Sequence, residues 1–60
     1  MRSGSLIKII EDDGWYLVRT KGSHFHFKHA TKKGLVTIPH PQKDVPKGTV
    51  ASILRQAGIK

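Results

Sequence analysis

The sequence predicts a small α+β domain with the element order α-β-β-β-α, in which a three-stranded antiparallel sheet carries two helices on one face. Apolar residues recur at helical spacing near both ends of the chain. Between these ends lie three segments that alternate or are rich in β-branched and aromatic residues, joined by short turns. The 60 residues suffice for one domain, which we expect to span residues 1–60.

The first helix is predicted at residues 4–13. Its apolar stripe, at positions i, i+3 and i+4, consists of Leu6, Ile9 and Ile10. Ser3 or Ser5 is expected to cap the start of this helix, because a serine hydroxyl can accept a hydrogen bond from a free N–H of the first turn. Gly14 stands where a glycine commonly ends a helix.

The second helix is predicted at residues 47–57 by the same argument. Its apolar stripe consists of Val50, Ile53, Leu54 and Ala57. Gly58 follows as a stop signal, and three prolines are expected to hold residues 40–46 extended before the helix begins. Because each helix has a single apolar stripe, both are predicted to pack on the same face of the sheet.

The three strands are predicted at residues 15–20, 24–29 and 35–39. The first, WYLVRT, and the last, LVTIP, are rich in β-branched and aromatic residues. Residues 21–23 and 31–34 each contain glycine and are predicted to be the turns between the strands. Short turns of this kind join neighbouring antiparallel strands, so the sheet is expected to be a meander.

The middle strand, HFHFKH, alternates strictly between two kinds of side chain. Successive side chains of a strand point to opposite faces of the sheet. The strand residues expected in the core are therefore Phe25 and Phe27, together with Trp15 and Leu17 of the first strand. The opposite face, away from the helices, is predicted to present His24, His26 and Lys28 to solvent.

Positive charge dominates most of the chain. The formal net charge is +7, and residues 14–60 contain nine lysines and arginines against a single acid, Asp44. Such a surface favours polyanions, with nucleic acid as the first expected partner class and an anionic membrane or an acidic protein as the second. The longest uncharged run, residues 34–42, is far too short to span a membrane, and the N-terminus has no secretory signal. We therefore expect a cytoplasmic protein.

A metal site at the histidines is not expected. His24 and His26 share one face of the predicted strand, a spacing that zinc could use, but a site needs a third ligand. His29 lies on the wrong face, which leaves His40 as the remaining candidate. Lysines on both sides of His24 would repel a cation. The prediction is therefore no metal and no other cofactor.

Acid–base chemistry is the stronger possibility for His24. An imidazole accepts and donates protons near neutral pH, because its ordinary pKa is about 6.5. The cations Arg19, Lys21 and Lys28 would bind a phosphate beside it. Cleavage of RNA needs a base for the 2′-OH, cations for the developing charge and an acid for the leaving oxygen, since RNA supplies its own nucleophile.

Further residues are candidates for contact with RNA. Gly22 and Ser23 directly precede His24, and they are either an ordinary hairpin turn or a place where the RNA backbone comes close to the imidazole. Lys47 opens the second helix, where backbone N–H groups can bind phosphate. With the cations named above, the full set of expected RNA-binding residues is Arg19, Lys21, Gly22, Ser23, His26, Lys28, His40 and Lys47.

Three stretches of the chain resemble one known family. The runs DGWYLVRTKGSHFHFKH, VTIPHP and KGTVASILRQAG occur in this order over almost the whole chain. Together they resemble the HicA toxins of bacterial and archaeal toxin–antitoxin pairs. The resemblance implies a small mRNA interferase with a fold like that of the double-stranded-RNA-binding domain.

The resemblance also implies roles for individual residues. The Gly-Ser-His histidine is the family's catalytic residue, so His24 takes that role and Gly22 the neighbouring structural one. The Pro-His histidine corresponds to His40, with a supporting role at most. The family works without metal and is silenced by a HicB antitoxin that covers the active site, here the His24 face. Phe25 stands where the family commonly has a polar residue or histidine, with histidine returning at position 26, so the general acid remains open.

A second function class is a non-catalytic RNA-binding module of the double-stranded-RNA-binding type. Such modules often carry a cluster of lysines at the start of the last helix. Here that region offers Lys43 and Lys47 without a dense cluster, which favours the nuclease. A helix-turn-helix DNA-binding protein is disfavoured because three strands separate the two predicted helices.

Overall fold

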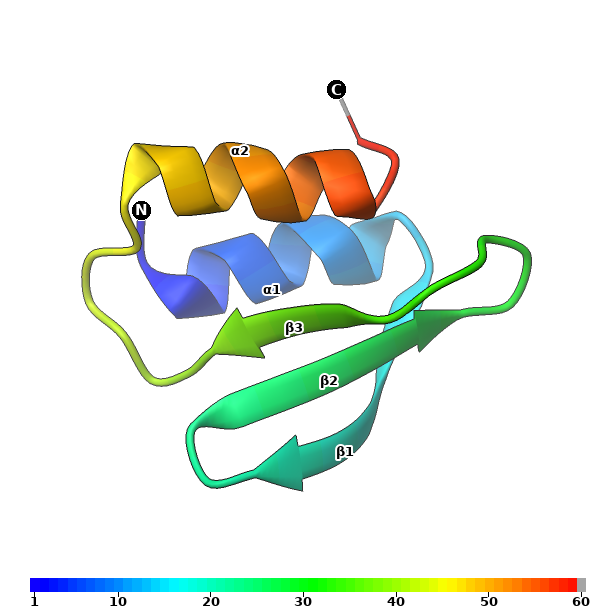
Figure 1. Cartoon of the computed structure of the whole chain (residues 1–60), viewed down its shortest axis with the longest axis horizontal. Helices are drawn as coiled ribbons and strands as arrows, with labels where there is room; N and C mark the ends of the chain where they lie inside the picture. Colours follow the sequence, from blue (N-terminus) through cyan, green and yellow to red (C-terminus); the bar gives the residue numbers. More distant parts are fainter. Residues whose placement is uncertain (60) are drawn as a thin grey trace.

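The structure, a computed structural model that describes residues 1–59, confirms the predicted order of elements (Figure 1). The elements are α1 (Ser3–Asp12), β1 (Trp15–Lys21), β2 (His24–His29), β3 (Val36–Pro39) and α2 (Lys47–Gln56). The strands form one antiparallel sheet in the order β1-β2-β3. The two helices lie side by side on one face of it, as predicted. None of the helices within residues 1–59 is long and apolar enough to cross a membrane.

The core lies between the helices and the sheet. Its buried apolar side chains are Leu6, Ile10, Trp15, Phe27, Val36, Ile38, Val45, Ile53 and Ala57. The predicted stripes of both helices supply four of these, with Ile9, Val50 and Leu54 half-buried. The indole N–H of Trp15 also donates a hydrogen bond to the Ala57 carbonyl over 3.2 Å, so β1 is tied to the end of α2.

The expectation that Leu17 belongs to the core is wrong. Leu17 faces the helix side, opposite Phe27 of β2, but its side chain remains 45% exposed. β1 is one of the two edge strands and lies farthest from the helices in Figure 1. Two helices cover β2 and β3 and leave the outer part of β1 without cover.

A β-bulge at Val18 interrupts the regular alternation of β1. Leu17 pairs with Phe27 and Arg19 pairs with His26, so Val18 has no partner on β2. Strict alternation along β1 would place Arg19 and Lys21 on the same face as Trp15. The extra residue shifts the pattern by one, as bulges do, and puts both cations on the face away from the helices.

The start of α1 is held by a contact that differs from the predicted cap. Arg2 is the N-cap residue, and no side chain caps this end. The buried Ser3 hydroxyl instead accepts a hydrogen bond from the Gln42 N–H over 2.8 Å and lies 2.7 Å from Nδ1 of His40. The Ser3 N–H donates to the Gln42 carbonyl. Ser3 therefore joins the start of α1 to the segment after β3.

At the other end of α1 lies the imidazole of His29. Its Nε2 atom donates to the Asp13 carbonyl over 2.7 Å, and Nδ1 accepts from the N–H groups of Thr31 and Lys32 at 3.0 and 3.2 Å. The ring meets the Trp15 indole edge to face with centroids 5.3 Å apart. His29 thus connects the α1–β1 junction to the β2–β3 turn.

Asp13 completes this junction. Its carboxylate accepts a hydrogen bond from the Lys32 ammonium, which also donates to the Ala57 carbonyl at the end of α2. The hydrogen bond from Lys32 is the largest cause that holds the pKa of Asp13 below its usual value, and the charges of Lys32 and His29 act in the same direction. A negative charge is unfavourable at the C-terminal end of a helix, and the ion pair with Lys32 in the β2–β3 turn compensates for it at Asp13.

Candidate functional site

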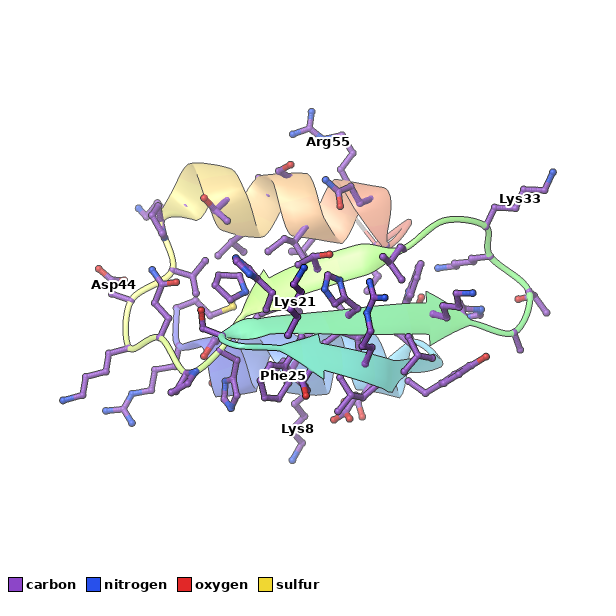
Figure 2. All side chains as sticks on the ribbon, turned by 60° about the horizontal axis from the view of Figure 1, so that its bottom comes forward. Lys8, Lys21, Phe25, Lys33, Asp44 and Arg55 are labelled. Carbon is purple, nitrogen blue, oxygen red and sulfur yellow. The ribbon has the colours of Figure 1, made fainter. Side chains whose placement is uncertain are left out.

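The face of the sheet away from the helices carries the residues singled out in the sequence. Three cross-strand pairs of β1 and β2 lie on it: Lys21 with His24, Arg19 with His26 and Tyr16 with Lys28. Figure 2 looks onto this face, with α1 behind the strands and Lys21 in front of the ribbon. The structure therefore brings His24 together with Arg19, Lys21, His26 and Lys28.

His24 is the first residue of β2 and follows a two-residue hairpin turn. The two central residues of the turn are Gly22 and Ser23. Gly22 has a positive φ of +58° and Ser23 does not, which is the pattern of a type II′ turn. A side chain at Gly22 would meet no atom within 4 Å, so the space above the turn is also open. The His24 side chain is exposed, and no hydrogen bond joins its ring to another residue within 1–59.

His26 differs from His24 because a neighbour fixes its ring. Its Nδ1 atom lies 2.9 Å from the hydroxyl oxygen of Thr37, the residue opposite it on β3. The ring is half-buried, and Nε2 has no hydrogen-bond partner within the described chain. Thr37 was not predicted as a site residue, although its place between Val36 and Ile38 in the last strand was the signal that it faces outward.

This face of the sheet is cationic. Arg19, Lys21 and Lys28 are all exposed on it. The four acidic side chains of the chain lie elsewhere, three at the end of α1 and Asp44 in the segment before α2. With no acid to neutralise the three cations, the surface around His24 attracts anions.

Next to His24 along β2 the same face is hollowed. A depression of about 370 Å³ is lined by Val18, Arg19, His26, Lys28 and Leu35. Val18 faces this hollow because it follows the inward-facing Leu17, and Leu35 because it precedes the inward-facing Val36. Neither apolar residue was predicted to belong to the site, and the outward position of Leu35 in the strand pattern was the available signal.

Two of the other candidate residues lie away from this face. The His40 ring is on the helix side, where it approaches Ser3 and meets the Phe25 ring at a centroid distance of 4.8 Å. A second hollow of about 570 Å³ lies there, between the start of α1 and residues 40–43. Lys47 begins α2 in the helical layer. The main chain still links the regions, since the His40 N–H donates to the Ser23 carbonyl over 2.7 Å.

The four histidines do not converge. His24 and His26 face away from the helices, whereas His29 and His40 lie on the helix side at opposite ends of the sheet. Within residues 1–59 no three histidine, aspartate or glutamate side chains come close enough to hold a metal ion together. The arrangement is instead one free imidazole beside cations, which can bind a phosphate and exchange a proton with a group attached to it.

Comparisons with known proteins agree with this architecture. A family model described as the HicA toxin of bacterial toxin–antitoxin systems matches residues 4–59. The structure is similar to a chain of a HicA3 and HicB3 toxin–antitoxin complex, with 38% identity, a TM-score of 0.87, and coverage of 100% of this chain and 97% of that one.

It is also similar to a chain of a toxin–antitoxin complex from Streptococcus pneumoniae, with 28% identity, a TM-score of 0.81 and 98% coverage of both chains. No curated protein matches the sequence. The family match covers nearly the entire chain and includes the hairpin before His24, both helices and all three strands. The chain belongs to the HicA toxin family of bacterial toxin–antitoxin systems.

Proposed function

We propose that this protein is the toxin of a toxin–antitoxin pair and acts as a metal-independent endoribonuclease on mRNA in the cytoplasm, with His24 as general acid and base. The observation that carries the proposal is the position of His24, exposed on a sheet face with three cations and no carboxylate. Membership of the HicA family supports the toxin part of the proposal.

The proposed reaction begins with an RNA phosphate against the cationic face. Lys21 is the cross-strand neighbour of His24, so its ammonium can hold a non-bridging oxygen of the phosphate that His24 approaches. Neutral His24 removes the proton from the 2′-OH, and the 2′-oxygen attacks the adjacent phosphorus. Lys21 stabilises the negative charge that develops on the phosphoryl oxygens, and the positive charge of Arg19 on the same sheet face acts in the same direction.

The bond from phosphorus to the 5′-oxygen then breaks, and that oxygen takes up a proton. His24 is suited to both proton transfers because neither of its ring nitrogens is hydrogen-bonded to another residue of 1–59. One nitrogen can accept the proton of the 2′-OH while the other, in the imidazolium, donates to the leaving oxygen. The products are a 2′,3′-cyclic phosphate and a free 5′-OH.

The chemistry of the new RNA ends tests this mechanism. Purified protein incubated with a defined mRNA should give 5′ ends that polynucleotide kinase labels directly, because they carry 5′-OH groups. The 3′ ends should resist tailing until the cyclic phosphate has been removed. A chelator such as EDTA should leave the rate unchanged. Products with 5′-phosphate ends, or loss of activity in EDTA, would contradict attack by the 2′-OH and favour an activated water.

We further propose that a HicB-like antitoxin inhibits the toxin by covering the His24 face. The relatives in solved complexes are named as toxin–antitoxin pairs. A partner that neutralises Arg19, Lys21 and Lys28 would carry acidic groups, since this face has no carboxylate of its own. In the complex, β2 and the hairpin before it should be protected from hydrogen–deuterium exchange. Protection limited to α1, with the His24 hairpin exchanging freely, would contradict occlusion.

A further inference from the structure

The hollow beside His24 combines two apolar walls with a polar rim. Val18 and Leu35, which are 44% and 43% exposed, form the walls, and Arg19, His26 and Lys28 complete the lining. The hollow is an open depression of about 370 Å³. A flat aromatic ring is the kind of group that such a hollow accommodates, because apolar walls take up its faces while polar atoms meet its edge.

The position of the hollow relates it to the scissile phosphate of the proposed reaction. His24 and His26 are two residues apart on one face of β2, which separates them by roughly 7 Å. One nucleotide can bridge this distance. With the phosphate at His24, the base of a neighbouring nucleotide therefore reaches His26 and the hollow.

The polar rim determines which bases fit. Arginine and lysine side chains are donors without an acceptor. The keto groups of guanine and uracil are acceptors that Arg19 and Lys28 can satisfy, and an arginine fork matches O6 and N7 of guanine. Adenine and cytosine present an amino group at the corresponding position. Its N–H groups would face the N–H groups of Arg19 and Lys28, so no hydrogen bond could form there. His26 can form a hydrogen bond with guanine or with uracil, because its free Nε2 atom can donate or accept.

Thr37 makes His26 a positioned contact. The hydrogen bond between the Thr37 hydroxyl and Nδ1, 2.9 Å long, sets the plane of the imidazole and directs Nε2 away from β3. A ring that is fixed before RNA arrives loses less conformational freedom on binding. Because the same hydrogen bond occupies Nδ1, only Nε2 of His26 is available to contact the base.

From these observations we propose that the hollow formed by Val18, Arg19, His26, Lys28 and Leu35 is a nucleobase subsite that selects guanine or uracil next to the cleaved bond. This inference rests on the proposed function, because it takes single-stranded RNA as the ligand and His24 as the place of the phosphate. It assigns the cleavage-site preference of the toxin to a site separate from the proton-transferring residue.

The test compares two leucines of nearly equal exposure. Leu35 is 43% exposed in the hollow, and Leu17 is 45% exposed on the helix side of β1. Short single-stranded RNAs with one cleavage site are prepared with each of the four bases on the 5′ and then on the 3′ side. Wild-type protein should prefer guanine or uracil at one of these positions. Leu35→Ala should lower kcat/KM about tenfold through loss of apolar contact with the base, and Leu17→Ala should leave kcat/KM unchanged.

A third variant separates base selection from charge. Arg19→Lys keeps the positive charge but loses the planar fork, so it should reduce the preference for guanine more than it reduces the overall rate. Equal losses in Leu17→Ala and Leu35→Ala would overturn the subsite, as would a base preference that neither Leu35→Ala nor Arg19→Lys alters.

Failure of the proposed function can be distinguished from failure of the subsite. The same oligonucleotides with a 2′-deoxy sugar at the cleavage position have no nucleophile, so their binding is measured by fluorescence anisotropy without cleavage. If wild-type protein does not cut RNA but Leu35→Ala alone weakens this binding about tenfold, the nuclease proposal fails and the subsite stands. If RNA is cut and Leu35→Ala binds as tightly as wild type, the subsite fails.

Discussion

Replacement of His24 by alanine is expected to abolish RNA cleavage and the growth arrest that follows expression of the protein. General acid–base catalysis by one positioned side chain contributes about 10²–10⁴-fold to a rate, and His24 is assigned both proton transfers. The measurement is the single-turnover cleavage rate of a defined RNA, together with growth after induction. The fold should be unaffected, because the exposed ring makes no hydrogen bond to another residue of 1–59.

His26→Ala is the matched control for His24→Ala. It removes an identical ring two residues along the same strand face, where we assign base recognition and no proton transfer. Its cleavage rate should fall about tenfold, well short of the loss at His24. Equal losses in both variants would assign the general acid to His26, and normal toxicity of His24→Ala would disprove the mechanism. Urea denaturation should place His24→Ala within about 0.5 kcal/mol of wild type.

Gly14→Ala is expected to destabilise the fold strongly, because the added methyl group meets both an unfavourable backbone conformation and the ring of His29. Gly14 has φ +107°, which costs another residue about 1–3 kcal/mol. An added Cβ would also lie 2.7 Å from Nε2 of His29, so the ring must move and its hydrogen bond to Asp13 is lost, at about 1 kcal/mol. The total, about 2–4 kcal/mol, approaches the ~3–5 kcal/mol that a core of this size supplies.

Gly34→Ala separates the two contributions. Gly34 has a similar φ of +95°, but a Cβ there meets no atom within 4 Å. Its replacement should therefore cost the backbone strain alone, and Gly14→Ala should be less stable by about 1 kcal/mol. Urea unfolding followed by circular dichroism measures both free energies of unfolding. Equal values for the two variants would show that contact with His29 contributes nothing at this junction.

The helices, the strand order and the face of β2 that carries the histidines were predictable from the sequence. Each depends on local periodicity, and the alternation of HFHFKH is strict. The position of Arg19 and Lys21 on that face was not predictable in the same way. It depends on the bulge at Val18, and residues 15–21 contain no glycine or proline that would mark one.

Contacts between distant parts of the chain explain the other differences. Ser3 or Ser5 was expected to cap α1, but neither does, and Ser3 lies against His40, which follows it by 37 residues. The role of His29 likewise depends on Asp13, 16 residues earlier. Exposure of Leu17 follows from the width of the helical layer, a property of the assembled fold. The contact of Ser3, the role of His29 and the exposure of Leu17 all depend on residues far away in the sequence, so the local sequence pattern does not predict them.

The buried core and the open face of the sheet share no residue, and this separation affects how the family can diversify. The nine core side chains hold the fold, while Arg19, Lys21, His26, Lys28 and Leu35 point away from it. Substitutions on an exposed surface usually change stability little. If the open face binds RNA and the antitoxin as we propose, a lineage can exchange its residues, and with them its target sequences and its matching antitoxin, while the small reserve of stability stays intact.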